Sequence, residues 1–484
     1  MTQKFTHIIM TRFILKYFFF SYLLLAYVSV FAQKPSAQKI VDSFVGQEIF
    51  RSASIGIEIR DLKTGELLAA SDSEKSLTPA STQKLITTAT ALEILGSDFQ
   101  FKTDVYITGR IDKYGNLMGN LIIRGFGDPT LGSKYFPKNN RFISTVYAEL
   151  KKLGIRQING KLIVDRSYYQ STIPRTWIWE DIGNYYGAVP HPLSYRDNTY
   201  TLHFDSKGAG QLTQIRRISS KQEDLKVSNK VMSSTINKDQ AYIFGGNTST
   251  HRIVEGTIPQ NRSDFKVKGA VSKPEMVLLS DLRKVLEAGG IPVKEHVFKT
   301  KTQKTLIQFN SPPLSDIVAL TNQKSINLFA DHLLFQIGIK QKKEGSWQTG
   351  IDAIKEFWQS QGIDSKSLLL HDGSGLSHFN AISAHTLNQI LVHMNKSVNS
   401  VAFLNSLPIA GKNGTLKNFG KNSLLAGTFK AKSGSMTAVR SYSGVLTKPN
   451  GQQLAISLIV NNYTCTSIQL YHKVKAMLVE LVKN

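Results

Sequence analysis

Two side chains at the start of a predicted helix have the types and spacing of a nucleophile and its base. Residues 79–95, PASTQKLITTATALEIL, begin with proline and small residues and continue without a helix breaker. In a helix, positions three apart lie on one side, so Ser81 and Lys84 come together near free backbone N–H groups. Leu85 and the apolar residues after it face inward, and apolar surroundings disfavour a charged lysine. A neutral Lys84 could take the proton of Ser81 and create an alkoxide nucleophile.

The chemistry makes a definite demand on Lys84. To act as a base near neutral pH, its pKa must fall from about 10.4 by about three units, or roughly 4 kcal/mol. Burial and a second cation nearby could supply that shift. The Ser-x-x-Lys pattern alone is weak, because it recurs at Ser36–Lys39 and Ser263–Lys266. A capped helix with a solvated lysine is the ordinary explanation of a lone match.

Two further polar motifs follow in a meaningful order. Ser325 and Asn327, separated by one isoleucine, lead into an apolar helical run. Lys432, Ser433 and Gly434 lie on a predicted strand near the C-terminus. Ser-x-x-Lys, then Ser-x-Asn, then Lys-Thr-Gly is the set of motifs found in acylating serine enzymes. Serine in place of threonine keeps the hydroxyl, which is the part that binds a carboxylate.

Each of these motifs also has a second match that fits the chemistry less well. Ser-Val-Asn at 397–399 lies in a polar stretch with no apolar continuation. Lys-Thr-Gly at 63–65 matches the third motif letter for letter, but it precedes the nucleophile and makes a natural hairpin turn. The set at 81–84, 325–327 and 432–434 is therefore preferred.

The chain resembles the low-molecular-mass penicillin-binding family of D-alanyl-D-alanine carboxypeptidases and endopeptidases that carry a large insertion. Six blocks carry the resemblance: LTPASTQKL (77–85), GNLIIRGFGDPTL (119–131), SPPLSDIVALTNQKSINLFADHLL (311–334), DGSGLS (372–377), LPIAGKNGTLK (407–417) and AKSGSM (431–436). The sequence departs from the family pattern at Ile326 and Ser433, and both changes spare the reactive side chains. They bear on substrate preference more than on activity.

The resemblance implies a role for each catalytic side chain. Ser81 would attack the carbonyl between two D-alanines with Lys84 as its base, and Ser325 would relay a proton to the leaving amine. Asn327 would orient Lys84 and the substrate amide. The backbone N–H groups of Ser81 and Ser435 would form the oxyanion hole, whose donors are each worth about 3 kcal/mol in comparable enzymes.

The resemblance also implies a set of substrate-binding residues. Lys432 and the Ser433 hydroxyl would hold the terminal carboxylate, on the strand that continues through Gly434 and Ser435. Asp165, which follows the predicted strand KLIVD, would bind the side-chain ammonium of diaminopimelate; a surface aspartate that ends a strand is the alternative. Neither a metal nor a cofactor is called for, and the expected partners are peptidoglycan peptides and β-lactam antibiotics.

The elements that must position these residues are read from the periodicity of the sequence. Residues 54–70 form a predicted hairpin, and 427–448 and 453–462 are predicted strands. Helices are predicted at 81–95, 141–153, 275–290, 314–340, 348–361 and 466–482. The region 171–262 has few helical patterns. The two ends of the chain thus combine predicted helices and strands, whereas the block between them shows a different pattern.

The fold class predicted from this pattern and the resemblance is α+β. A transpeptidase/β-lactamase-like domain, an antiparallel sheet flanked by helices, would carry two nested inserted domains. The predicted boundaries are a signal peptide at 1–32, a catalytic domain at 33–98 and 306–484, an inserted domain II at 99–170 and 263–305, and an inserted domain III at 171–262. Three domains in sequence are the alternative.

Charge and the N-terminus indicate where such a chain would work. Lys4, Arg12 and Lys16 precede an uncharged run at 17–32, which indicates an export signal cut near Gln33, with a retained signal anchor as the alternative. The only cysteine is Cys465, so no intramolecular disulfide can form. The net charge of +24 favours an anionic wall polymer or peripheral contact with a membrane surface. No run of five basic residues occurs, and aromatic residues are not interleaved with basic ones, so nucleic acid is not an expected partner.

Three functions therefore stand as hypotheses for an exported, periplasmic protein. The first is a serine peptidase that acts as a carboxypeptidase, an endopeptidase or both on peptidoglycan stem peptides. The second is a β-lactamase, which needs a dedicated base for deacylation that the sequence does not offer at a convincing spacing. The third is a wall-binding or antibiotic-sensing module that is acylated without turnover. The sequence does not indicate whether carboxypeptidase or endopeptidase activity is the stronger, and it does not indicate the oligomeric state.

Overall fold

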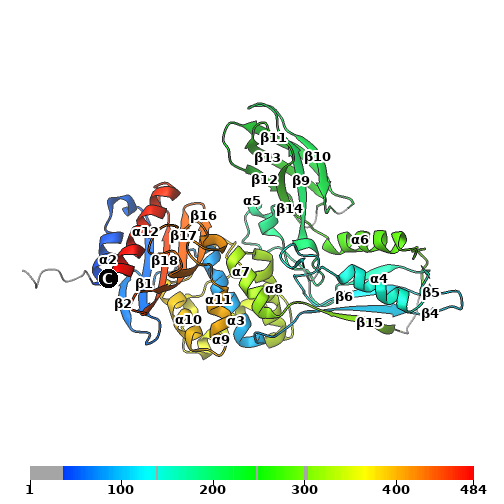
Figure 1. Cartoon of the computed structure of the whole chain (residues 1–484), viewed down its shortest axis with the longest axis horizontal. Helices are drawn as coiled ribbons and strands as arrows, with labels where there is room; N and C mark the ends of the chain where they lie inside the picture. The colour runs from blue at the N-terminus through cyan, green and yellow to red at the C-terminus, as the bar shows by residue number, and fades with distance from the viewer. Residues whose placement is uncertain (1–35, 138–139, 222, 247–248, 299–302) are drawn as a thin grey trace, which may run out of the picture.

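The computed structural model describes residues 36–137, 140–221, 223–246, 249–298 and 303–484. The signal peptide predicted at 1–32 lies outside the described residues. Figure 1 shows an elongated molecule, with a sheet at one end, a group of helices in the middle and two further β-rich parts beyond it. Among the residues described, no helix combines the length and apolarity that crossing a membrane requires.

A five-stranded antiparallel sheet draws its strands from both ends of the chain. Its order is β16 (Phe429–Met436), β17 (Val439–Thr447), β18 (Gln453–Asn461), β1 (Ser54–Asp61) and β2 (Leu67–Ser71). The helices α2 (Ala37–Val45) and α12 (Ser467–Lys483) lie side by side on one face, and α10 (Ala384–Lys396) packs on β1, β17 and β18 (Figure 1). This is the predicted antiparallel sheet flanked by helices, and 63–65 forms the turn of the β1–β2 hairpin.

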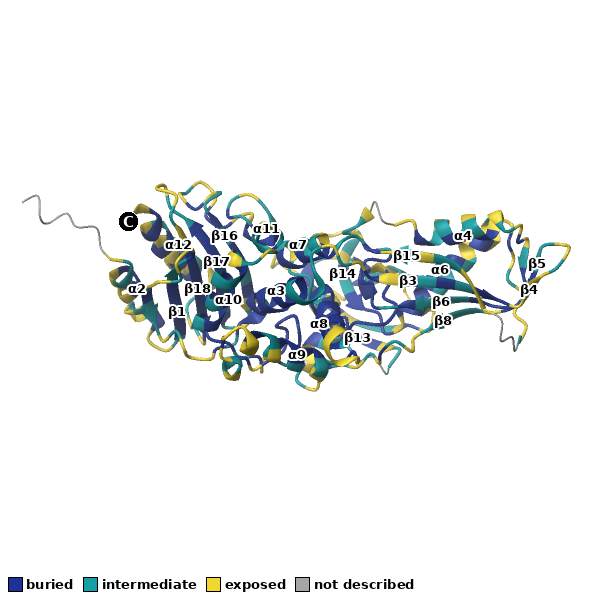
Figure 2. Ribbon diagram, turned by 90° about the horizontal axis from the view of Figure 1, so that it is seen from below, coloured by how far each residue is buried: buried dark blue, intermediate teal, exposed yellow. Residues whose placement is uncertain are grey.

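A helix that is buried on nearly all sides lies at the centre of the helical part. The turn that contains Ser81, η2 (Ala80–Gln83), is a 3-10 turn, and α3 (Lys84–Leu95) follows it directly. Every residue from 84 to 92 is buried, and α3 is dark blue between its neighbours in Figure 2. Such a helix is covered on all sides. Its neighbours are α10 and four further helices: α7 (Leu314–Lys324), α8 (Asn327–Lys342), α9 (Trp347–Ser360) and α11 (Ser400–Ser406).

The continuous helix predicted at 314–340 is wrong in one respect. The chain forms two helices, α7 and α8, and the break falls on the Ser-x-Asn motif. Ser325 adopts a left-handed conformation with φ of 56°, and Ile326 is extended. Left-handed backbone is costly for a residue with a side chain, and such outliers concentrate at functional sites. The break turns the two polar side chains of the motif in different directions.

The part of the chain between the two halves of the central sheet forms four smaller sheets. A four-stranded sheet contains β15 (Gln303–Asn310), β3 (Lys102–Thr108), β6 (Leu121–Gly125) and β8 (Leu162–Asp165), and α4 (Phe142–Lys152) and α6 (Pro274–Ala288) accompany it. Beside it lies a small sheet of β4 (Arg110–Ile111), β5 (Asn116–Met118) and β7 (Gln157–Ile158). The third sheet contains β10 (Gln214–Ser219), β9 (Thr199–Asp205) and β14 (Phe265–Ala270). The fourth contains β11 (Lys226–Ser234), β13 (His251–Pro259) and β12 (Gln240–Phe244).

These inserted sheets share one hydrophobic core cluster that is separate from those of the sheet and helices described first. The strand β14 lies beyond the boundary predicted at 262, yet it pairs with β9. The strand β15 runs across the boundary predicted between 305 and 306 and pairs with β3. The short elements α5 (Trp179–Ile182) and η4 (Tyr185–Gly187) also belong to this region, and η4 lies against α8.

Candidate active site

The amine of Lys84 lies between the groups that the sequence analysis assigned to it. Lys84 Nζ is 3.0 Å from Ser81 Oγ and 2.6 Å from Asn327 Oδ1. It also contacts the backbone carbonyl of Ser374, at 2.6 Å. Lys84 is fully buried, whereas Ser81 is partly exposed. The predicted nucleophile is therefore partly exposed, while its predicted base is shielded from solvent.

The three partners of Lys84 are well suited to an uncharged amine. The amide oxygen of Asn327 and the carbonyl of Ser374 can only accept hydrogen bonds, whereas the hydroxyl of Ser81 can also donate one. An uncharged amine has two donors for the two acceptors and one lone pair for the Ser81 proton. Loss of a proton from Lys84 thus turns the contact with Ser81 from donating to accepting without any movement of atoms.

Burial supplies the shift that the chemistry needs. It lowers the pKa of Lys84 to about 8, against the opposing effect of the carboxyl groups of Asp331 and Asp372. The second cation that was expected near Lys84 is Lys432. Burial, and then the charge of Lys84, lower the pKa of Lys432 well below its usual value.

The second and third motifs meet beside the first. Lys432 Nζ donates to Ser325 Oγ at 2.9 Å and to the Ser433 carbonyl at 2.7 Å. The left-handed turn at Ser325 sends its hydroxyl toward β16, and Asn327, two residues on, points to Lys84. The Ser433 hydroxyl donates to Thr415 Oγ1 at 2.9 Å, a partner that the sequence analysis did not identify.

Gly434 brings the strand β16 against the turn η2 that contains Ser81. A Cβ atom at this position would lie 2.9 Å from the backbone nitrogen of Ser81 and 2.6 Å from the Pro79 carbonyl. Only glycine allows the strand to approach so closely. The backbone N–H groups of Ser81 and of Ser435, which is exposed, are thus on neighbouring segments, as an oxyanion hole requires.

Two buried carboxyl groups near Lys84 were not expected from the sequence. Asp331 lies one helical turn after Asn327, and its Oδ1 accepts the Gly373 N–H at 2.9 Å. Burial raises the pKa of Asp331 well above its usual value. Asp372 is also buried and begins the segment that presents the Ser374 carbonyl. The spacing of four residues between Asn327 and Asp331 was the available signal for the first, whereas Asp372 had none beyond its position in the DGSGLS block.

The structure places Asp165 in the inserted four-stranded sheet. Its carboxylate pairs with Arg124 at 3.3 Å and accepts the Ser167 N–H. A second aspartate, Asp181 in α5, has one carboxyl oxygen that is buried and makes no hydrogen bond among the described residues, and this oxygen lies 4.0 Å from His378 Nε2. Burial raises the pKa of Asp181 to about 6. The carbonyl of nearby Tyr186 accepts a hydrogen bond from Asn327 Nδ2 at 2.9 Å.

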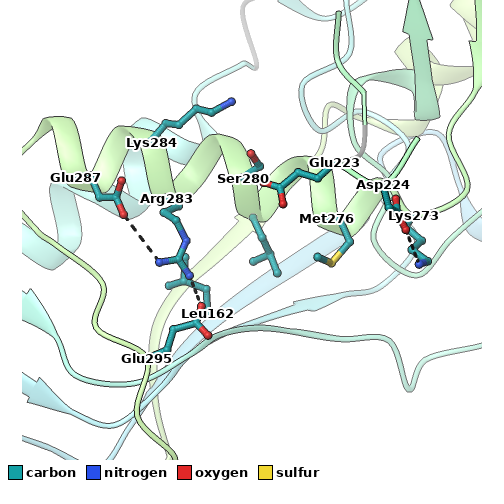
Figure 3. A pocket seen from close by; sticks show the side chains of 11 residues that line it. Leu162, Glu223, Asp224, Lys273, Met276, Ser280, Arg283, Lys284, Glu287 and Glu295 are labelled. Atoms are coloured by element: carbon teal, nitrogen blue, oxygen red, sulfur yellow. Dashed lines mark hydrogen bonds and ion pairs between the residues drawn. The ribbon is translucent and has the colours of Figure 1, made fainter. Parts of the chain in front are cut away.

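A separate pocket lies beside α6, away from all three motifs. Charged side chains surround it, including Glu223, Arg283, Glu287 and Glu295, and Arg283 is paired with two of the carboxylates (Figure 3). None of the predicted site residues lines it. This pocket is therefore separate from the site around Lys84.

A serine and a lysine one turn apart, with a Ser-x-Asn turn and a Lys-Ser-Gly strand beside them, define an acylating serine enzyme of the penicillin-binding class. The chain belongs to the D-Ala-D-Ala carboxypeptidase 3 (S13) family, which matches residues 37–484. It is 28% identical over 470 residues to D-alanyl-D-alanine carboxypeptidase DacB of Haemophilus influenzae, covering 94% of this chain and 95% of the relative. It is 26% identical over 443 residues to a D-alanyl-D-alanine carboxypeptidase of an Actinomadura species, covering 88% and 80%.

A solved structure agrees over nearly the whole chain. The crystal structure of penicillin binding protein 4 from Haemophilus influenzae has a TM-score of 0.78 and 27% identity, and the match covers 92% of this chain and 99% of that one. The same protein complexed with a β-lactam gives a TM-score of 0.74. The family resemblance, the fold class and the enzyme class predicted from the sequence are thereby confirmed.

Proposed function

We propose that this protein is a serine-type D-Ala-D-Ala carboxypeptidase, a DD-endopeptidase or both, that it acts on peptidoglycan stem peptides through an acyl-enzyme, and that Ser81 is the nucleophile. The observation that carries the assignment of Ser81 is the position of Lys84 Nζ, 3.0 Å from Ser81 Oγ and held by two acceptors. The position of Lys432 beside Ser325 supports the remaining roles.

The reaction would proceed in two stages. Ser81 Oγ bonds to the carbonyl carbon between the last two D-alanines while its proton passes to Lys84. When the intermediate collapses, the C–N bond breaks and the leaving amine receives a proton by way of Ser325. Water then attacks the acyl-enzyme, and the shortened peptide and free Ser81 result. Penicillins would acylate the same hydroxyl.

The substrate would be held by its two charged ends. Lys432 and the Ser433 hydroxyl would bind the terminal carboxylate at the edge strand of the sheet. Asp165 stays the sequence-based prediction for the ammonium of diaminopimelate, although Arg124 already neutralises it. Asp181 is the structural alternative because one of its oxygens is buried and makes no hydrogen bond among the described residues, with His378 Nε2 4.0 Å away. Work on the cell wall also requires export, which the predicted signal peptide supplies.

The test is labelling with a fluorescent penicillin. Ser81→Ala should lose all labelling while its unfolding temperature stays within a few degrees of that of the wild type. Labelling that persists in this variant would refute the assignment. Incubation with a diaminopimelate-containing pentapeptide separates the alternatives: released D-alanine supports the peptidase, and its absence supports a sensor. Penicillin turnover faster than about one per second would instead favour a β-lactamase.

A further inference from the structure

The carboxylate of Asp372 is held by an unusually complete set of donors. Its Oδ1 accepts the Gly375 N–H at 2.7 Å and Asn380 Nδ2 at 3.0 Å. Its Oδ2 accepts the Ser377 N–H at 2.7 Å and the indole N–H of Trp177 at 2.8 Å. A carboxylate with donors on both oxygens folds the backbone around it into one conformation. We call this backbone the 372–377 loop.

The 372–377 loop packs against the turn η2 and the first turn of α3. Its Ser374 carbonyl accepts from Lys84 Nζ, and its Gly373 carbonyl accepts from Thr87 Oγ1 at 2.7 Å, one turn further along α3. Gly375 has a φ of 76°, and a Cβ atom there would lie 2.0 Å from the Ala80 carbonyl. The loop therefore fixes one of the two acceptors that aim the amine of Lys84 at Ser81.

Trp177 does not belong to the catalytic turn or to the central sheet. It lies in the region inserted between the motifs and packs with Val189 and with Leu376 of the 372–377 loop in a small hydrophobic cluster. Trp347, at the start of α9, packs against the same cluster, but its indole N–H donates to the Thr172 carbonyl. Of these two neighbouring indoles, Trp177 is the one that donates to Asp372.

We propose that Trp177 and Asp372 are positioning residues for Lys84, by which the inserted region takes part in acylation. The indole N–H orients the carboxylate, the carboxylate fixes the 372–377 loop, and the Ser374 carbonyl of that loop holds the amine toward Ser81. This proposal rests on the proposed function, because it assumes that Lys84 activates Ser81. It makes the insertion a working part of the active site.

The experiment measures the rate constant of acylation by a fluorescent penicillin as a function of pH. The rate is normalised to the amount of protein that becomes labelled at the end of the reaction. Trp177→Phe keeps most of the apolar ring and removes the N–H donor. This variant should be acylated at least about tenfold more slowly than the wild type, both at pH 7 and on the high-pH plateau. The reason is that misplacement of the Lys84 amine slows the step. Trp347→Phe is the matched control, since it removes an indole N–H from the same cluster, and its rate should stay within about twofold of that of the wild type. A rate per labelled molecule does not change when a variant merely folds less well.

Asp372→Asn adds a readout that depends on charge. The carboxyl groups of Asp372 and Asp331 both favour the charged form of Lys84, against the effect of burial. In Asp372→Asn the negative charge is removed, so the pH at half-maximal acylation should fall by at least about half a unit. The acylation rate on the high-pH plateau should also be lower than that of the wild type. If this variant does not fold, the Trp177→Phe comparison decides alone.

Two results would overturn the proposal. One is a Trp177→Phe rate that equals the Trp347→Phe rate, and the other is an Asp372→Asn profile whose midpoint does not move. If the Ser81→Ala variant is still labelled by fluorescent penicillin, the proposed function itself fails. If Ser81→Ala loses its label and Trp177→Phe reacts like the wild type, only the positioning role fails.

Discussion

The amine of Lys432 lies 2.9 Å from the hydroxyl of Ser325, although the two residues are 107 positions apart in the sequence. The contact joins the strand that would bind the substrate carboxylate to the hydroxyl that would deliver a proton to the leaving amine. In the proposed mechanism, a product D-alanine would leave from the point where these two groups meet. The group that would bind the terminal D-alanine and the group that would protonate it as it leaves are thus in direct contact.

Replacement of Lys432 should abolish the preference for a free carboxylate. The wild type should favour a D-Ala-D-Ala peptide with a free carboxylate over its C-terminal amide by about tenfold to a hundredfold in kcat/KM, as expected for a hydrogen bond to a charged group. In Lys432→Met the two substrates should react within a few-fold of each other. A preference that survives in this variant would show that the carboxylate is bound elsewhere.

The pH profile of acylation should report the basicity of Lys84. Because burial lowers the pKa of Lys84 to about 8, the rate should rise with pH through about 8 and then level off. Only the uncharged amine accepts the Ser81 proton, so the rate is lost as pH falls. Asn327→Asp places a negative charge where Lys84 Nζ now contacts an amide oxygen at 2.6 Å. The midpoint should then move up by at least about one unit, and a profile unchanged by this substitution would argue against Lys84 as the base.

The side-chain ammonium of the substrate provides a test between two aspartates. Stem peptides that carry a free or an acetylated amine on the third residue are compared with the Asp165→Asn and Asp181→Asn variants. The sequence-based prediction requires Asp165→Asn to lose the preference for the free amine by about tenfold. Loss of this preference in Asp181→Asn alone would transfer the role to Asp181.

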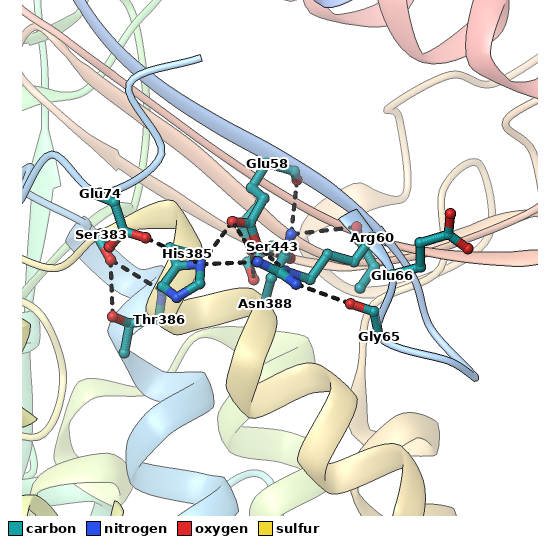
Figure 4. Close-up of polar contacts among 12 residues, drawn as sticks. Glu58, Arg60, Gly65, Glu66, Glu74, Ser383, His385, Thr386, Asn388 and Ser443 are labelled. Carbon is teal, nitrogen blue, oxygen red and sulfur yellow. Dashed lines mark hydrogen bonds and ion pairs between the residues drawn. The ribbon is translucent and has the colours of Figure 1, made fainter. Parts of the chain in front are cut away.

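A buried charge cluster on the central sheet should make stability depend on pH. Glu58 in β1 is almost fully buried, accepts two hydrogen bonds from Arg60 and contacts His385 Nδ1 at 2.8 Å (Figure 4). Burial opposes ionisation of Glu58, but the hydrogen bonds from His385 and Arg60 together lower its pKa. The hydrogen bond to Glu58 raises the pKa of His385, and the charge of Glu74 adds to this.

The sign of the effect follows for each group. The contribution of His385 is fully present below its unfolded pKa of about 6.5 and is lost as pH rises through its raised value. The contribution of Glu58 is present above its unfolded pKa of about 4.3 and is lost as pH falls through its lowered value. His385→Ala should therefore reduce the free energy of unfolding in urea by about 2 kcal/mol at pH 6, and by less at pH 8.5. His472→Gln, at an exposed position of α12, is the control; a loss that is equal at both pH values would contradict the account.

The sequence was informative where local pattern and chemistry coincide. The hairpin at 54–70, the strands after 427 and the helix at 275–290 follow from periodicity and turn residues, and the structure contains them. The order of the three motifs predicted that Ser81, Asn327 and Lys432 would share one site, because acylation needs all three groups. Their contacts confirm that these segments meet.

The features that escaped prediction depend on long-range contacts. Nothing near Asp372 in the sequence shows that Trp177, 195 residues earlier, donates to it. The helical pattern across 314–340 hides the break at Ser325, because the apolar spacing continues on both sides and the contact of Ser325 with Lys432 is a tertiary one. The sequence also did not show that the carboxyl groups of Asp331 and Asp372 lie near Lys84. Their effect on the pKa of Lys84, which opposes that of burial, was therefore not expected.

The central claim is that the hydroxyl of Ser81 is the group that becomes acylated. Mass spectrometry of the penicillin-treated protein, followed by peptide mapping, tests it most directly. The account predicts one adduct, of the mass of the intact antibiotic, on the peptide that contains Ser81. An adduct on a peptide that lacks Ser81, or no adduct on a protein that still releases D-alanine, would contradict it.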